Sequence, residues 1–269
     1  GKLEDFDFKK TVIRSRVKGV YSEINQILAK TESDEIKEKY KDCYNAIDLM
    51  EELAEILTAN KIKRGAPQIE TSESKLIIDE NDVCVDVKCR ERGKSELIIE
   101  EFMLMANQSA ATLGRMKEIP FVYRIHEDPS PEKVLNLKET LLKMGIVVPD
   151  FTEIKPTHLA RILEKSKNTP SFVVVNKLVL RSMAKAKYSP EPKGHFGLVL
   201  DDYAHFTSPI RRYPDLSIHR ILSDLVSGVP EKMIKKRYAA FASDSSTHSS
   251  QMEITAMTVE RDCEDCYKA

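Results

Sequence analysis

The sequence predicts a helix-rich α+β fold with a small antiparallel sheet. Three observations support this: apolar residues recur at spacings of three and four over long stretches, two short apolar runs flank a polar turn, and prolines and glycines interrupt the pattern at intervals. The chain has 269 residues, of which 41% are hydrophobic and 32% charged, enough for a folded core with a solvated surface. Because we find no internal repeat and no long linker, we expect a single domain over residues 1–269.

Composition limits the classes of protein to consider. The 42 Lys and Arg residues nearly cancel the 43 Asp and Glu residues, so any nucleic-acid site must come from local placement of basic residues. No apolar run approaches the roughly 20 residues of a membrane-spanning helix. The five cysteines are an odd number with no disulfide pattern. We therefore expect a protein of the reducing cytoplasm with no membrane partner.

The first half of the chain predicts mostly helix. An N-terminal stretch with scattered apolar residues predicts a strand that leads into a helix from Ser22 to about Lys30. The next apolar pattern predicts one long helix, with Asp34 as its N-cap and its end near Asn60. The runs 76–78 and 83–87 predict a hairpin, and a dense apolar face predicts a helix over 95–117.

The second half predicts shorter elements. Prolines mark a loop over 120–131, and helices are then expected over 131–144, 156–165 and 172–186. A stretch with Pro and Gly precedes a predicted strand over 196–200. From Pro209 onward the chain is predicted to be helical, with a break near 228–230.

The most informative stretch covers residues 205–220. Thr207 or Ser208 can cap a helix whose first turn holds Pro209, because the missing N–H of proline is harmless there. The N-terminus of a helix exposes free N–H groups and the positive end of the helix dipole. Two arginines in the same turn would add planar guanidinium groups, each of which can bind two phosphate oxygens at once. The pattern therefore predicts a phosphate-binding corner.

These arginines, Arg211 and Arg212, also have a plainer interpretation. Adjacent basic residues are common at protein surfaces, and ion pairs at such positions are frequent. Arg211 and Arg212 could be ordinary surface or ion-pair residues, for instance with Asp215 or Asp201. The residues alone leave both interpretations open.

The stretch 205–220 resembles, nearly residue for residue, the signature of the ribonuclease II and ribonuclease R family, whose catalytic unit is the RNB exoribonuclease domain. Other parts of the chain resemble the family in the same order: Val12 to Ser15 with Tyr21, Arg64 to Ala66, Ile99 to Asn107, Pro120 to Glu127, Gly194 to Leu198, and Glu260 to Asp262. The resemblance covers essentially the whole chain and is strongest to the bacterial ribonuclease R branch. It implies a partial RNB-type nuclease domain, the distal part of that unit.

The resemblance also implies an activity. In the family, the 3′-terminal phosphodiester of single-stranded RNA is hydrolysed processively in the 3′-to-5′ direction, which releases nucleoside monophosphates. Two Mg²⁺ ions hold the scissile phosphate and activate water. We therefore expect single-stranded RNA as partner, Mg²⁺ as cofactor of the intact enzyme, and a monomer.

Site residues follow from matching positions in the resemblance. Arg211 matches the catalytic arginine that binds the scissile phosphate, and Glu260 matches a catalytic glutamate that faces the same pocket. Among substrate-binding positions, Tyr21 and Glu100 match residues that contact sugars near the 3′ end and select ribose. The remaining substrate-binding candidates, supports or backbone contacts, are Arg212 and Arg220. We expect Arg211, Tyr21, Glu100 and Glu260 to surround one pocket.

Three departures from the family pattern accompany the resemblance. The metal ligands of the family are clustered aspartates upstream of the tyrosine segment, and this chain holds no such cluster, so we expect no metal ligand in it and no activity from it alone. The flanking RNA-binding OB-folds also have no counterpart here. Ile69 stands where the family has a base-stacking aromatic, and it lacks a π-face. The alternative is a non-catalytic RNA-binding or scaffold protein that retains the RNB fold.

Overall fold

The computed structural model of the chain describes residues 2–70, 74–80, 83–89, 92–148 and 153–268. Within these ranges the helix-rich α+β prediction is confirmed, with two small antiparallel sheets beside the helices. The helices are α1 (Tyr21–Ala29), α2 (Asp34–Tyr40), α3 (Tyr44–Lys63), α4 (Lys94–Met116), α5 (Pro131–Lys143), α6 (Pro156–Ser166), α7 (Phe172–Ser182), α8 (Tyr213–Val226) and α9 (Glu231–Lys268). The strands are β1 (Ser74–Ile78), β2 (Cys84–Cys89), β3 (Tyr123–Ile125) and β4 (Lys187–Ser189).

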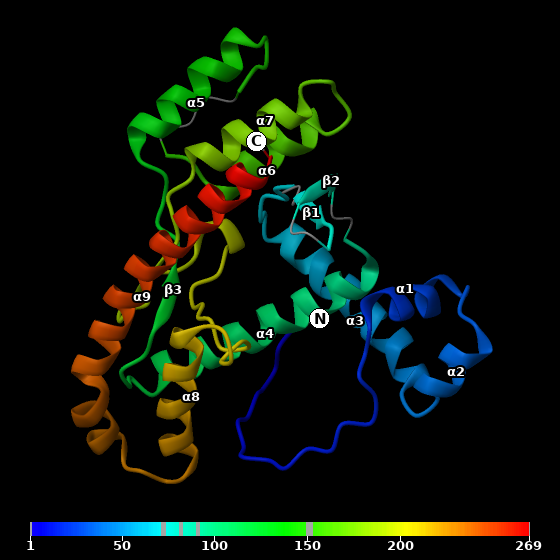
Figure 1. The fold of residues 1–269 in the computed structure, drawn as a ribbon. Coiled ribbons are helices and arrows are strands. Elements are labelled where there is room, and N and C mark those ends of the chain that lie inside the picture. Colours follow the sequence, from blue (N-terminus) through cyan, green and yellow to red (C-terminus); the bar gives the residue numbers. More distant parts are fainter. Residues whose placement is uncertain (1, 71–73, 81–82, 90–91, 149–152, 269) are drawn as a thin grey trace.

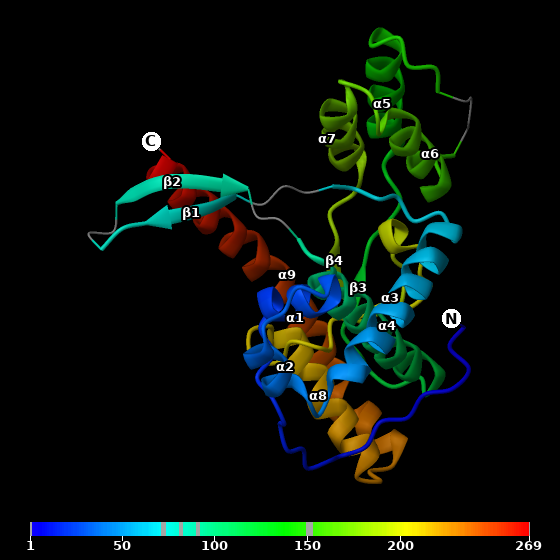
Figure 2. The ribbon, with the colours of Figure 1, turned by 90° about the vertical axis from the view of Figure 1, so that its right-hand side faces the viewer.

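The helices form three groups around α4 (Figure 1). Helices α1 and α3 pack against one end of α4 and α2 packs against α1, whereas α8 and α9 lie toward the other end of α4, beside β3 and β4. Helices α5–α7 form a separate group at the top of the view. Figure 2 shows the β1–β2 hairpin extending away from the helical groups. None of the helices in the described ranges is long and apolar enough to cross a membrane.

Each group has its own apolar core. The core that matters most for the site lies between α4, β3, α8 and α9, and it includes Phe121 and Ile218, both fully buried. Gly114 on α4 allows the close approach, because a Cβ there would lie 2.7 Å from the Phe121 ring. The other two cores lie among α5–α7 and among α1–α4.

The β1–β2 hairpin and the helix over 95–117 are confirmed, the latter as α4. The predicted long helix from Asp34 is wrong: residues 41–43 form a turn that separates α2 from α3. Asp34 is also not the cap, because the Ser33 hydroxyl accepts the hydrogen bond of the Ile36 N–H. The buried Tyr40 continues the apolar spacing across the corner, which explains why the pattern resembled one helix.

The predicted N-terminal strand is also wrong. Residues 2–20 form no regular secondary structure and run as an irregular segment across one end of the molecule (dark blue in Figure 1). A strand needs a neighbour for its backbone N–H and C=O groups, and no described strand pairs with this segment. Its Phe8 ring instead packs edge-on against Phe206, with ring centroids 5.5 Å apart.

The predicted strand over 196–200 is a short 3₁₀ turn, Phe196–Leu198. Val199 adopts a left-handed conformation, with φ of 54°, and so reverses the chain. The Leu200 carbonyl then accepts the N–H of His195 at 2.7 Å. The predicted helix over 172–186 ends at Ser182, and the chain continues into β4, which pairs with β3. The sequence patterns missed both of these three-residue strands.

Candidate functional site

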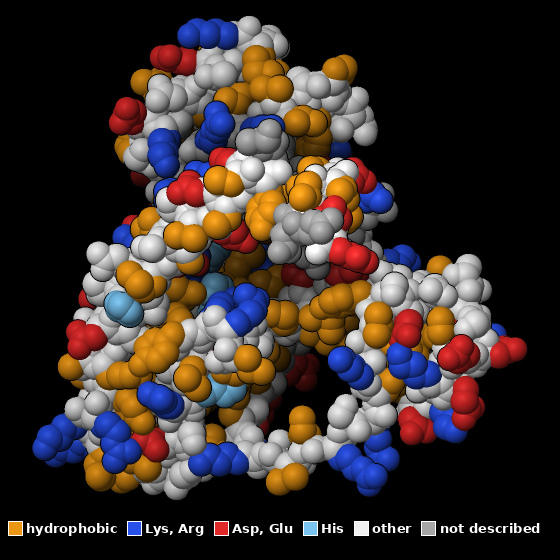
Figure 3. Space-filling view, in the orientation of Figure 1, with side chains coloured by type: hydrophobic (Ala, Val, Ile, Leu, Met, Phe, Trp, Pro, Cys, Tyr) orange, Lys and Arg blue, Asp and Glu red, His pale blue; other side chains and the backbone are white. Residues whose placement is uncertain are grey.

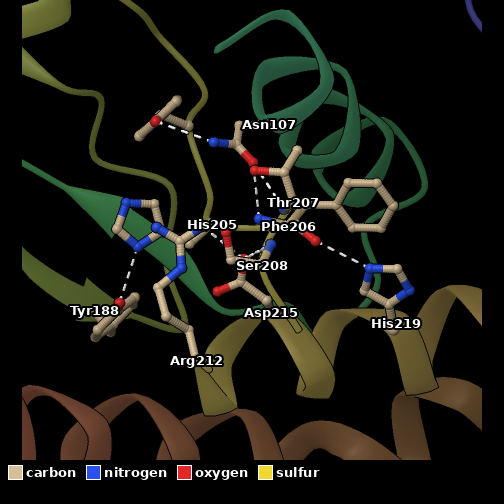
Figure 4. Close-up of polar contacts among 10 residues, drawn as sticks. Asn107, Tyr188, His205, Phe206, Thr207, Ser208, Arg212, Asp215 and His219 are labelled. Atoms are coloured by element: carbon tan, nitrogen blue, oxygen red, sulfur yellow. Dashed lines mark hydrogen bonds and ion pairs between the residues drawn. The ribbon is translucent and has the colours of Figure 1, made fainter. Parts of the chain in front are cut away.

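The candidate site is built around the loop between Tyr203 and α8 (Figure 4). The loop leaves the β3–β4 sheet, since the Tyr203 carbonyl accepts the N–H of Arg124 at 2.8 Å and Ala204 bridges to Tyr123. Its backbone therefore starts from a fixed point in the buried core. Residues 205–212 then lead into α8 and carry the two candidate arginines.

Asn107 on α4 holds the first part of this loop. Its Oδ1 accepts the backbone N–H groups of Phe206 at 2.8 Å and Thr207 at 3.2 Å. Its Nδ2 donates to the Tyr203 hydroxyl at 3.1 Å. Sequence reasoning did not single out Asn107, although it lies on the buried face of α4, where Ala110, Ala111 and Gly114 follow at helical spacing. A polar residue on such a face needs partners, and here the partners are the loop.

His219 on α8 holds the same part of the loop from the other side. Its ring stacks on Phe206 with centroids 4.3 Å apart and an interplanar angle of 8°. One ring nitrogen lies 2.9 Å from the Phe206 carbonyl oxygen. The loop is therefore fixed between α4 and α8, through hydrogen bonds on one side and ring stacking on the other.

The helix that carries the arginines begins later than predicted. Helix α8 starts at Tyr213, so neither Arg211 nor Arg212 lies in its first turn, and Thr207 and Ser208 do not cap it. The physical reason is Pro214. In a helix that began at Pro209, this proline would lie in the interior, where it has no N–H to donate to the carbonyl of residue 210 and its ring clashes with that carbonyl. The predicted phosphate-binding helix N-terminus is wrong in this respect.

The arginines instead belong to a tight turn closed by Ser208. The Ser208 carbonyl accepts the N–H groups of Arg211 at 3.3 Å and Arg212 at 3.0 Å. The fully buried Asp215 accepts the Ser208 N–H at 2.7 Å and the Arg212 Nη2 at 2.7 Å, both through Oδ1. The ion-pair interpretation is thus confirmed for Arg212. Arg211 is exposed, and its side chain makes no hydrogen bond or ion pair within the part of the chain that the structure describes.

A row of aromatic and imidazole rings lies behind the turn. The Tyr188 hydroxyl is 2.9 Å from Nδ1 of His205, and the Arg124 guanidinium lies 4.7 Å from the centre of the Tyr188 ring. Arg124 also pairs with Glu253 of α9 at 2.6 Å. The row continues through Tyr203 to His195, with centroids 5.2 Å apart. These contacts join the sheet, the loop and α9 into one packed unit.

Desolvation sets the protonation of this row. Burial, followed by the nearby Arg212 and Arg124 charges, lowers the pKa of His205 to about 2. Burial, followed by His126 and Arg124, lowers the pKa of His195 to about 3. Burial also raises the pKa of Tyr188 to about 12. At neutral pH the row is uncharged apart from its arginine, so these histidines act as packing and hydrogen-bonding groups.

The two predicted ribose contacts lie near the start of α4. Tyr21 is exposed on α1 and lines an apolar cavity of about 360 Å³ between α1, α3 and α4. The Glu100 side chain is about half exposed, 3.8 Å from the Lys61 ammonium. The neighbouring Glu101 is buried and forms an ion pair with Lys61, so α3 and α4 share a buried charge pair. Sequence reasoning missed this pair, although Glu101 follows Ile98 at helical spacing on the apolar face.

The other predicted residues lie elsewhere. Glu260 is exposed on the C-terminal half of α9. Arg220 is exposed on α8 and lines a cavity of about 670 Å³ together with Lys9, Lys10 and His219. Among the described residues, no hydrogen bond, ion pair or ring contact joins any two of Arg211, Tyr21, Glu100 and Glu260. The expected single pocket around these four therefore stays a prediction.

The acidic residues around the loop do not suit Mg²⁺. Asp215 is committed to Ser208 and Arg212, and Glu253 is committed to Arg124. Across the ranges that the structure describes, no group of three or more His, Cys, Asp and Glu side chains is placed to hold a metal ion. Mg²⁺ needs several oxygen ligands in near-octahedral array, and this donor set does not supply them.

Ile69 is partly buried and packs against the core of α5–α7. Figure 3 shows a hollow in the middle of one face, with histidine side chains visible at its edge. The face around this hollow carries hydrophobic, basic and acidic side chains together.

The chain matches the family model described as the RNB domain over residues 1–228. It is 44% identical over 224 residues to ribonuclease R of Thermotoga maritima. This alignment covers 82% of this chain and 31% of that protein. It is also 33% identical over 270 residues to ribonuclease R 1 of Lactococcus lactis. This alignment covers 100% of this chain and 33% of that protein. The chain thus spans about a third of the length of these curated relatives.

A solved structure supports the same relationship. Mycoplasma genitalium RNase R in complex with ribose-methylated single-stranded RNA superposes with a TM-score of 0.84 at 28% identity, over 92% of this chain and 39% of that one. Family model, relatives and fold agree with the signature around Arg211 and with the helix-rich α+β architecture. The chain belongs to the RNB-domain family and is a relative of ribonuclease R.

Proposed function

We propose that this chain is the distal part of the nuclease domain of a processive 3′-to-5′ exoribonuclease that hydrolyses single-stranded RNA to nucleoside monophosphates. Family membership supports the reaction class. One structural observation carries the proposal for this site: Arg211 is exposed on a turn that buried groups hold in place. A guanidinium presented in this way is suited to bind a phosphate with two parallel hydrogen bonds.

Each candidate residue would have a separate role that follows from its chemistry. Arg211 would stabilise charge that develops on the scissile phosphate. Tyr21 and Glu100 would contact the sugars near the 3′ end, where a carboxylate can accept a hydrogen bond from a 2′-hydroxyl. Glu260 would face the same phosphate from α9, and Arg220 would contact the RNA backbone. In this proposal Arg212 supports the site through its pair with Asp215.

We also propose that Mg²⁺ serves the intact enzyme and is held by residues outside this chain. The donor set of the described residues does not fit the ion, so the isolated chain should not hydrolyse RNA. Among the residues that the structure describes, Cys43, Cys84, Cys263 and Cys266 are free, and the last two are exposed, which suits the cytoplasm as its compartment. We propose that the intact enzyme acts there as a monomer.

The test is hydrolysis of single-stranded RNA by the longer protein that contains this chain, with and without Mg²⁺. We expect Arg211→Ala to slow hydrolysis about 100-fold or more, because a donor aimed at developing charge is lost. Arg181→Ala is the matched control, since Arg181 is also exposed but lies on α7. An unchanged rate for Arg211→Ala contradicts its catalytic role. RNA binding without hydrolysis by the unaltered protein favours the non-catalytic alternative.

A second prediction concerns the choice of sugar. Glu100→Ala should weaken the discrimination between RNA and DNA 3′ ends, because the proposed acceptor for the 2′-hydroxyl is removed. The measurement is the ratio of cleavage rates on matched oligomers with ribose or deoxyribose at the last positions. Glu139→Ala, an exposed glutamate of α5, should leave the ratio unchanged. Undiminished rejection of DNA by Glu100→Ala removes Glu100 from this role.

A further inference from the structure

The two adjacent arginines differ sharply in their surroundings. The Arg212 side chain is 19% exposed, and its Nη2 lies 2.7 Å from Asp215 Oδ1. Arg211 is exposed, with no hydrogen bond or ion pair of its side chain among the residues that the structure describes. One arginine therefore has an internal partner, whereas the other is available to a ligand.

We propose that Asp215 is a positioning residue that fixes the turn from Ser208 to Arg212, so that Arg211 and not Arg212 is presented to the RNA phosphate. This inference rests on the proposed function of Arg211. The assignment divides the arginine pair into a substrate contact, Arg211, and an internal cation, Arg212. It gives Asp215 an effect on catalysis without contact with RNA.

The geometry of Asp215 supports this role. Its side chain is 0% exposed, and one oxygen, Oδ1, accepts from the Ser208 N–H and from the Arg212 Nη2, both at 2.7 Å. These two donors, Ser208 and Arg212, stand at the two ends of the turn (Figure 4), and Arg211 directly precedes Arg212 in the sequence. The Ser208 carbonyl closes the same turn by accepting the N–H groups of Arg211 and Arg212. A single buried carboxylate thus ties both ends of the segment that carries Arg211.

Other anchors of the loop do not reach this segment. Asn107 and His219 bond to residues 206 and 207, upstream of the turn. Among the described hydrogen bonds that join the turn to other side chains of the fold, those at Ser208 and Arg212 both end on Asp215. The orientation of Arg211 relative to α8 therefore depends on this carboxylate.

The negative charge of Asp215 is as important as its hydrogen bonds. Asp215 Oδ2, Arg212 Nε and Thr207 Oγ1 are buried and have no hydrogen-bond partner among the described atoms. Within the described ranges, the hydrogen bond and ion pair of the Arg212 side chain are with Asp215 alone. An asparagine at position 215 could still accept the Ser208 N–H, but it would leave the half-buried Arg212 without a counter-charge. The Arg212 side chain would then lose its ion pair with Asp215, and the turn would lose one of the two contacts that hold its ends.

A double-mutant cycle in the longer protein tests the inference. Asp215→Asn, Arg211→Ala and the double variant are compared by single-turnover hydrolysis of single-stranded RNA, with enzyme in excess and sampling long enough to follow the slowest variant. We expect Asp215→Asn to lower the maximal single-turnover rate constant about tenfold or more, with little change in the enzyme concentration that gives half of this maximum, because misplacement of a catalytic group by a fraction of an ångström has effects of this size. In the Arg211→Ala background, Asp215→Asn should change the rate less than about twofold.

Asp224→Asn is the matched control. Asp224 is on the same helix, is partly buried and pairs with Arg237 at 2.5 Å, but it lies away from the turn. We expect its hydrolysis rate to equal that of the unaltered protein. Equal losses from Asp215→Asn in both backgrounds would overturn the inference, because Asp215 would then act independently of Arg211. An unaffected rate for Asp215→Asn also overturns it. A full rate for Arg211→Ala alone is a different result, which contradicts the proposed function itself.

A second pair of variants applies if Asp215→Asn does not fold. Arg211→Lys should lower kcat, because the guanidinium proposed to bind the phosphate is lost. It should leave the thermal midpoint unchanged, because the Arg211 side chain is exposed. Arg212→Lys keeps the charge opposite Asp215 but loses the planar fork, so it should lower the thermal midpoint and lower kcat less than Arg211→Lys does. A larger loss of kcat from Arg212→Lys than from Arg211→Lys would overturn the assignment of Arg211 as the substrate contact and Arg212 as the internal cation.

Discussion

Asn107 connects α4 to the loop of the candidate site through three hydrogen bonds. We predict that Asn107→Ala lowers the free energy of unfolding by about 2–4 kcal/mol, because it leaves two backbone N–H groups and a tyrosine hydroxyl without their partner. The measurement is urea unfolding followed by circular dichroism. Gln108→Ala, one position later and partly exposed, is the control and should change stability by less than about 1 kcal/mol.

Asn107→Asp provides a sharper comparison at this position. Aspartate keeps an acceptor for the Phe206 and Thr207 N–H groups but loses the donor to Tyr203. It also buries a carboxylate, because position 107 is 2% exposed. We therefore expect Asn107→Asp to lower the free energy of unfolding at pH 7.5 at least as much as alanine does. A clearly smaller loss would contradict this, because the backbone contacts would then outweigh the cost of the buried charge.

Single residues of the site were predicted unequally well from the sequence. The Arg212–Asp215 ion pair was one of two interpretations of the arginine pair, and the structure confirms it. Asn107 was missed because its amide serves a loop about 100 positions away, and local spacing shows only that it faces the core. A pattern shows which face a residue occupies, whereas the partner depends on the tertiary fold.

At the scale of elements, the Lys61–Glu101 pair joins α3 to α4 in a buried setting. We predict that Lys61→Met lowers the free energy of unfolding by about 3–5 kcal/mol, because Glu101 is left buried without its cation. Lys61→Met combined with Glu101→Leu should recover most of this loss, since an apolar pair can replace a buried ion pair. Urea midpoints of the three proteins check this.

Lys63→Met is the control for that experiment, because Lys63 is exposed near the end of the same helix. Its unfolding midpoint should stay close to that of the unaltered chain. If the double variant is as unstable as Lys61→Met alone, the loss arises from packing of the lysine stem and not from the unpaired carboxylate.

Helices were predicted well wherever one apolar face packs on one neighbour. Helices α4, α5 and α6 begin and end within one or two residues of the expected positions. The errors occur where the backbone is decided by something other than periodicity: the corner between α2 and α3, the left-handed Val199, and Pro214 inside the predicted helix from Pro209. The last of these was available from the sequence, because an interior proline excludes a continuous helix.

At the scale of the whole molecule, the buried histidines predict a dependence of stability on pH. The folded pKa values of His205 and His195, about 2 and about 3, lie below the unfolded value near 6.5. As the pH falls below about 6.5, the unfolded chain binds protons that the folded chain does not, so stability is lost. Between pH 6.5 and 5.5 the two histidines should together reduce the free energy of unfolding by about 2 kcal/mol.

Urea midpoints at pH 7.5, 6.5 and 5.5 measure this slope. His205→Gln should remove about half of the pH-dependent loss in this window, because glutamine takes up no proton. His248→Gln, an exposed position on α9, should leave the slope as it is. An unchanged slope for His205→Gln would mean that His205 is protonated in the folded chain and that its surroundings are more polar than this packing implies.

The family of the whole chain was predicted correctly, and the comparisons confirm it. The arrangement of the site was harder to predict. A signature identifies which residues belong together, but Tyr21, Glu100, Arg211 and Glu260 lie on α1, on α4, on the loop before α8 and on α9. Their mutual distances depend on how the helical groups pack, and the spacing of residues along the chain carries no information about that packing.

The buried contact between Arg212 and Asp215 constrains how this sequence can diverge. A lineage that lost the carboxylate would keep an uncompensated guanidinium, and a lineage that lost the guanidinium would keep an uncompensated acid, so each single step is disfavoured. Positions 212 and 215 should therefore covary among relatives, changing together or not at all. Arg211 is free of this constraint, so under the proposed function only selection for RNA binding would preserve it.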